Sequence, residues 1–142
     1  MKKYVVDASV ILKWVVGNER ELDHEKAKSL LETWTDGDIE LSSPILWQYE
    51  VGNFLGWSLQ DEAIDKMNLL LNLNIRNVAL TNNMVNQCFT WMRQKKITFY
   101  DASYLAVAFE VQGTLITADE KFAEKMGKTN RICLLKNLDP GA

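Results

Sequence analysis

Three aspartates stand where the strands of an α/β protein are expected to end. Asp7 directly follows the apolar run KYVV at residues 3–6, and Asp119 follows TLIT after one alanine. Asp101 opens an apolar segment that leads into TLIT. Because ligands of parallel sheets bind outside the carboxyl ends of the strands, these carboxylates are expected to converge on one crevice.

A glutamate on an apolar helix is the fourth candidate. Glu50 lies in PILWQYEVGNFLGW, where helical spacing places it on one face with Leu46, Asn53 and Trp57. Glu50 and Asn53 are therefore the polar pair on a face otherwise suited to burial.

Four carboxylates in one crevice, with no Lys or Arg directly beside them in sequence, would repel one another strongly. Divalent cations relieve such repulsion, and oxygen ligands without His or Cys favour Mg²⁺ or Mn²⁺ over Zn²⁺. This chemistry suits phosphodiester hydrolysis, in which one metal activates water and a second, ~3.5–4 Å away, stabilises the leaving oxygen. His24, the one histidine, lies in the charged run ELDHEK and is expected to face solvent without a catalytic role.

Each acidic residue also has a purely structural interpretation. An Asp at a helix start commonly caps the helix, and Asp7, Asp101 and Asp119 all qualify. The fuller capping box is missing, because no Glu or Gln stands three residues after any of them. Glu50 taken alone fits a half-exposed helix flank, so only the joint pattern favours a site.

Apolar runs and helical periodicity predict alternating strands and helices, and hence a mostly parallel sheet covered on both faces. Ser43 is expected to cap a helix that begins at Pro44, Thr81 or Asn82 to cap a later one, and Gly113 and Gly127 to end two more. Strands are expected at residues 3–6, 39–41, 77–80, 114–117 and 131–135, and helices at 8–16, 21–35, 44–59, 61–73, the stretch ending in RQKK, 101–112 and 119–126.

The bulk properties indicate one domain over residues 1–142. The net charge of −3 counts mildly against a nucleic-acid partner. No window approaches the ~20 apolar residues that span a bilayer, so we expect a cytoplasmic protein with no membrane contact. Cys88 and Cys133 stand far apart in apolar surroundings, which predicts buried reduced thiols.

Four fragments in order, VVDASVILKW, SSPILWQYEVGNFL, FYDASYLAVAFEVQG and LITADEKF, resemble the PIN-domain ribonucleases, and most closely the VapC-like toxins of prokaryotic toxin–antitoxin pairs. The resemblance implies a three-layer α/β/α sandwich around a parallel sheet of about five strands. It also implies endonucleolytic RNA cleavage that depends on Mg²⁺ or Mn²⁺. The family's acidic quartet corresponds to the four carboxylates singled out above: Asp7, Glu50, Asp101 and Asp119.

The resemblance also implies supporting residues and partners. Ser9 and Thr117 match hydroxyl positions that hydrogen-bond metal or water, and Asn53 matches a polar position that orients the Glu. The alternative interpretations without a role in the site are a serine at a helix start for Ser9 and an ordinary strand threonine for Thr117. The family implies a homodimer and an antitoxin whose short helix covers an apolar groove. Two basic clusters are candidates for RNA phosphates or are solvated helix faces: residues 92–96, and Lys121, Lys125, Lys128 and Arg131.

Rival enzyme classes lack a required residue. GKT at 127–129 is no P-loop, because Phe122 stands where the loop needs Gly. A dehalogenase-like phosphatase needs Asp at the position of Ser9. A receiver domain needs Asp near the end of the middle strand, but Thr81 and Asn82 follow the strand that ends at Leu80. The remaining alternative is a PIN fold that binds RNA or protein without turnover.

Overall fold

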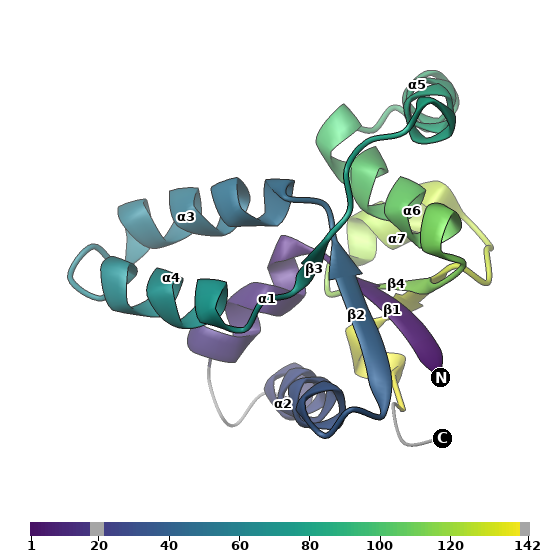
Figure 1. The fold of residues 1–142 in the computed structure, drawn as a ribbon. Coiled ribbons are helices and arrows are strands. Elements are labelled where there is room, and N and C mark those ends of the chain that lie inside the picture. The colour runs from purple at the N-terminus through teal and green to yellow at the C-terminus, as the bar shows by residue number, and fades with distance from the viewer. Residues whose placement is uncertain (18–21, 140–142) are drawn as a thin grey trace.

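The computed structural model describes residues 1–17 and 22–139, and its centre is a five-stranded sheet (Figure 1). All pairings are parallel, and the strand order is β3-β2-β1-β4-β5. The predicted parallel α/β fold is confirmed. The strands are β1 Lys2–Val6, β2 Ile39–Ser43, β3 Arg76–Asn77, β4 Thr114–Thr117 and β5 Ile132–Leu134.

Helices cover both faces of the sheet and give the predicted sandwich (Figure 1). The chain runs outward from β1 to β3 and then returns to β4 beside β1, so right-handed crossovers place the earlier and later helices on opposite faces. The earlier helices are α1 Ala8–Val15, α2 Leu22–Thr35, α3 Leu46–Ser58 and α4 Ala63–Asn72. The later ones are α5 Asn82–Lys95, α6 Phe99–Val111 and α7 Glu120–Met126. A short 3₁₀ helix, η1 Leu135–Asn137, follows β5 and contacts α2.

Helix α6 packs directly on the sheet, where it contacts β1, β2 and β4. Its seven consecutive residues 102–108 are all buried, because α5 covers the side turned away from the sheet. The apolar character of this segment in the sequence thus corresponds to burial on all its sides. Only the two ends of the helix reach solvent, at Tyr100 and from Phe109 onward.

The predicted start of α3 is wrong. Ser43 remains in β2, and its hydroxyl donates to the Val6 carbonyl at 2.9 Å instead of capping a helix. Helix α3 begins two residues after Pro44, with no side-chain cap. Strand β3 is also shorter than predicted, because after Asn77 only Val78 N–H still reaches the sheet, at the Ser43 carbonyl.

Gly113 has a different role from the one predicted. The left-handed residue that ends α6 is Gln112, with φ 57°, not the glycine. A Cβ at Gly113 would lie 2.6 Å from the Lys3 carbonyl oxygen of β1. The glycine therefore permits the close approach of the two chain segments where β4 begins. Gly127 ends α7 as predicted, with φ 76°.

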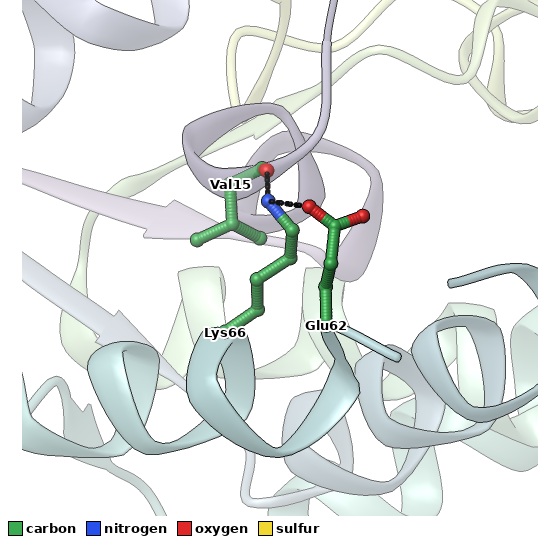
Figure 2. A network of polar contacts seen from close by, with 3 residues as sticks. All are labelled: Val15, Glu62 and Lys66. Atoms are coloured by element: carbon green, nitrogen blue, oxygen red, sulfur yellow. Dashed lines mark hydrogen bonds and ion pairs between the residues drawn. The ribbon is translucent and has the colours of Figure 1, made fainter. Parts of the chain in front are cut away.

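Helices α3 and α4 lie side by side as a hairpin that projects from the sheet (Figure 1). Its contact with the body runs mainly through α1, which α3 packs against. Figure 2 shows a polar tether at α4, where the Lys66 ammonium donates to the Val15 carbonyl at 2.5 Å and lies 3.9 Å from Glu62. Lys66 thereby satisfies a carbonyl at the carboxyl end of α1.

Three other sequence predictions can be compared with the structure. His24 is half-buried, not solvent-facing, and its Nδ1 is buried without a hydrogen-bond partner among the described residues. Both cysteines are free thiols, Cys88 buried and Cys133 half-buried. Within the described ranges, no helix combines the length and apolar character that crossing a bilayer requires.

Candidate active site

Asp7 sits at the end of β1, held by three hydrogen bonds. Its Oδ1 accepts from the Ser9 hydroxyl at 2.5 Å and from the Val10 N–H at 3.3 Å. Its Oδ2 accepts from the Thr117 hydroxyl. The carboxylate thus caps α1 and joins the first strand to the fourth.

The parallel register explains how residues so far apart in sequence meet. Val6 of β1 lies opposite Ile116 of β4, so the next residues, Asp7 and Thr117, are neighbours at the carboxyl edge of the sheet. The Thr117 hydroxyl also accepts from the Asp119 N–H at 3.0 Å. The Ser9 hydroxyl accepts from the Ala118 N–H at the same distance. Ser9 and Thr117 therefore fix the position of Asp7 and the turn that presents Asp119.

Capping distinguishes the three aspartates. Asp119 caps α7 by accepting from the Phe122 N–H at 3.0 Å, as Asp7 caps α1. Asp101 caps nothing: it is the third residue of α6, whose cap is Thr98. The Thr98 hydroxyl accepts from the Asp101 N–H at 3.1 Å, and it also hydrogen-bonds the Asp101 carboxylate, which lowers the pKa of that group.

Glu50 reaches the site from α3 and is half-buried. Its Oε1 accepts from the Tyr104 hydroxyl at 2.5 Å. Asn53, the predicted orienting residue, is exposed on α3. Tyr104 is not among the residues predicted from the sequence. The available signal is its place in an apolar helix three residues after Asp101, because a buried tyrosine needs a hydrogen-bond partner for its hydroxyl.

Electrostatic repulsion links the four carboxylates. Burial, with a smaller contribution from the charge of Asp119, raises the pKa of Asp7 to about 6, against the hydrogen bonds from Ser9, Thr117 and Val10. Burial also raises the pKa values of Asp101 and Glu50, with added repulsion from Asp119 on Asp101 and from Asp101 on Glu50. The four groups thus influence one another in the order Asp7, Asp119, Asp101, Glu50.

A cavity of about 170 Å³ opens beside Asp101 and Asp119. Lys96, from the end of α5, lines it together with Lys121 and Lys125 of α7. The charge of Lys125 lowers the pKa of Asp101, which places that ammonium close to the carboxylate. Members of both predicted basic clusters therefore share one cavity.

Electrostatic interactions thus connect all four predicted carboxylates near the carboxyl edge of the sheet. Within residues 1–17 and 22–139, no three Asp, Glu, His or Cys side chains are grouped closely enough to enclose a metal ion. The donor set nevertheless consists of carboxylate oxygens, the ligands that hard divalent cations prefer.

The model of the PIN domain family matches residues 4–128 of this chain. The chain belongs to the PIN-domain family. This PIN-domain protein is 32% identical over 133 residues to ribonuclease VapC3 of Pyrobaculum aerophilum, a match that covers 87% of the chain and 94% of the relative. That similarity places it among the VapC-like members of the family.

Solved structures share the fold of this PIN-domain protein at low sequence identity. A toxin–antitoxin complex from Klebsiella pneumoniae matches with a TM-score of 0.67 and 16% identity, over 93% of this chain and 97% of that one. VapC20 of Mycobacterium tuberculosis, described as a sarcin–ricin loop cleaving toxin, matches with a TM-score of 0.63 and 18% identity, over 89% and 96% of the two chains.

Proposed function

We propose that this protein is a metal-dependent endoribonuclease of one domain that acts as the toxin of a toxin–antitoxin pair. The observation that carries the proposal is the set of four carboxylates near the carboxyl edge of the sheet, each of which is repelled by at least one other. The similarity to a protein named as a ribonuclease supports RNA as the substrate. The four catalytic and metal-binding residues proposed are Asp7, Glu50, Asp101 and Asp119.

The site chemistry fits Mg²⁺ or Mn²⁺. Three of the carboxylates have raised pKa values, so their negative charge is costly in the absence of a cation. A bound cation would relieve that cost, polarise the phosphate and supply activated water. The side chains would have to move closer together than they lie here.

Ser9 and Thr117 have a supporting role in this proposal. Their hydroxyls fix the Asp7 carboxylate and occupy both of its oxygens with donors, which disfavours rotation out of the site. Because each hydroxyl also accepts a backbone N–H of the turn after β4, a displacement of Asp7 would disturb the presentation of Asp119.

The lysine-lined cavity is the proposed path of the RNA strand beside the acidic edge of the sheet. Lys96, Lys121 and Lys125 supply positive charge within the same cavity as Asp101 and Asp119. A backbone phosphate next to the scissile one would be attracted there, which answers the objection from the acidic net charge.

Salt dependence of RNA binding tests this path. In a Lys121→Gln/Lys125→Gln variant, the negative slope of log binding constant against log salt concentration is expected to become shallower by about 1.4. Each lost contact to a phosphate of single-stranded RNA removes about 0.7. Fluorescence anisotropy in EDTA measures the slope. Lys3→Gln/Lys28→Gln removes the same charge outside the cavity and outside both basic clusters, and it should keep the wild-type slope. Equal losses in the two variants would contradict a specific path.

Exposed apolar side chains on the α3–α4 hairpin support protein partners. Tyr49 is 70% exposed, Trp57 78% and Ile64 76%. Large apolar side chains gathered on one projecting element are typical of interaction surfaces. We assign this surface to the contacts of a homodimer and a cognate antitoxin. Structures similar in fold include toxin–antitoxin complexes.

Cleavage of a labelled RNA pool tests the function. Wild type is expected to cut with Mg²⁺ or Mn²⁺ and not in EDTA. Asp101→Asn should abolish cutting, because Asp101 caps no helix and its carboxylate is proposed to act only in the site. Asp36→Asn, in the exposed turn after α2, is the matched control. RNA binding without cleavage under every metal condition would favour the alternative, a binding module without turnover.

A further inference from the structure

Glu50 is attached to the site differently from the other acidic residues. It lies on the hairpin that packs on α1, whereas Asp7 and Asp119 flank strands and Asp101 lies on the central helix. The preceding residue on α3, Tyr49, is mostly exposed, and so is Asn53. A glutamate in such a position needs a specific contact if its carboxylate is to face the acidic edge and not solvent.

Tyr104 provides that contact from the buried run of α6. The residue is 3% exposed, and its hydroxyl donates to Glu50 Oε1 at 2.5 Å. The backbone N–H of Ala8, the first residue of α1, also hydrogen-bonds the hydroxyl oxygen. One oxygen atom therefore connects α1, α3 and α6 beside the acidic site.

In this hydrogen bond the Tyr104 hydroxyl is the donor and the Glu50 carboxylate is the acceptor. Burial raises the pKa of Tyr104 far above its usual value, and the charge of Glu50 raises it further. The hydroxyl consequently stays protonated and acts as donor to the carboxylate. Because the ring is enclosed by core side chains, the donor is fixed in direction, while the Glu50 side chain has three torsions to be restrained.

We infer that Tyr104 is a positioning residue that holds the Glu50 carboxylate toward the site and so prepares it to bind a divalent cation. The inference rests on the proposed function, because it assumes that Glu50 is a ligand. Partners that orient a ligating carboxylate typically contribute 10–100-fold to metal affinity. Tyr104 does not touch the reacting atoms and acts through Glu50 alone.

Manganese binding to the intact chain without RNA tests the inference, with calorimetry as the readout. Tyr104→Phe removes one oxygen and keeps the buried ring, and it is expected to weaken Mn²⁺ binding about 10-fold or more. Tyr100→Phe is the matched control, because this exposed tyrosine lies one turn earlier on α6. It should bind Mn²⁺ like wild type.

The Glu50→Gln background separates positioning from general damage to the fold. There Tyr104→Phe should add less than about twofold, because residues that act through one another are not additive. Wild-type affinity in Tyr104→Phe, or an undiminished loss in the Glu50→Gln background, would overturn the inference.

Thermal unfolding in EDTA provides a metal-free readout of the same pair. The shifts of the unfolding midpoint caused by Tyr104→Phe and Glu50→Ala should combine to less than their sum, and additive shifts would show that the contact is not made. If wild type binds no Mn²⁺, the proposed metal role fails, and this cycle still decides whether Tyr104 holds Glu50.

Discussion

Asp7 and Asp119 follow neighbouring parallel strands, whereas Glu50 and Asp101 lie on two helices that reach the same edge from different layers. The strand-end pair is held by backbone register, by hydroxyl groups and by capping of α1 and α7. The helix-borne pair is held by one side chain each: Tyr104 hydrogen-bonds Glu50, and Thr98 hydrogen-bonds Asp101 at its N–H and its carboxylate.

This difference separates rigidity from adaptability within one site. A carboxylate fixed by sheet register cannot be moved without disturbing the strands, while one fixed by a single hydrogen bond can be moved by one substitution. The strand-end pair therefore sets the location of the site. The helix-borne pair is the half that can shift its position more easily.

The largest effect is expected at the buried strand-end carboxylate. The folded-state pKa of Asp7 is about 6 against an ordinary 3.8, so the folded protein binds this proton more tightly than the unfolded chain. Its contribution to stability is present below pH ~4 and lost as the pH rises through ~6, at a cost of about 3 kcal/mol. Asp7→Asn removes this charge but also one of the two acceptor oxygens, so it should be more stable than wild type by up to about that amount at pH 7.5 in EDTA.

Urea unfolding at pH 4.5 and pH 7.5 checks this prediction. The difference between Asp7→Asn and wild type should shrink at the lower pH, and Asp36→Asn should track wild type at both. A difference that is independent of pH would mean that Asp7 is not strained by its own charge.

The next effect concerns the hydroxyls that hold Asp7. Thr117→Val keeps the shape of the side chain but removes a donor to Asp7 and an acceptor for the Asp119 N–H. Cleavage by the proposed ribonuclease should fall about 10–100-fold. Thr90→Val, on the exposed side of α5, is a matched control whose hydroxyl bonds only a carbonyl of its own helix. An unchanged kcat in Thr117→Val would contradict rigid support of the strand-end pair.

A smaller effect is expected where the helix-borne pair is capped. Thr98→Ala removes the acceptor of the Asp101 N–H and should cost about 1 kcal/mol in unfolding free energy. Thr98→Ser keeps the hydroxyl and should recover most of it. Chemical denaturation of both variants measures the difference, and equal stabilities would show that the cap does not matter.

The smallest effect is expected at Asn53. Because Tyr104 contacts Glu50 and Asn53 is exposed, Asn53→Ala should change cleavage by less than about twofold. If Asn53 orients Glu50, as the sequence predicts, the loss would match that of Tyr104→Phe under the same conditions.

Local sequence rules predicted the strand-end residues well and their side-chain partners poorly. Asp7 and Asp119 follow recognisable apolar strands, so the rule for parallel sheets was sufficient to place them. The bond from Thr117 to Asp7 depends on the register of β1 against β4, which no local pattern contains. For the same reason the structure, and not the sequence, joined Lys96 to Lys121 and Lys125.

The wrong predictions also have a common physical cause. Ser43 has a cap-forming side chain, yet its hydroxyl donates to the Val6 carbonyl of the neighbouring strand β1, and Ser43 remains part of the sheet. Gly113 follows a helix, yet the position needs glycine because the Lys3 carbonyl lies against it. In both cases a contact between strands distant in sequence overrode the local signal.

The strand order also times the appearance of the acidic edge during synthesis. Strand β4 inserts beside β1, so Asp7 meets Thr117 only after all the residues between them have been made. A chain still emerging from the ribosome can form β1 and β2 early, but it lacks the partner strand that carries Thr117 and Asp119. Long-range closure of this kind is also the slow part of folding. The complete acidic edge therefore exists only after residues from the last third of the chain have been added.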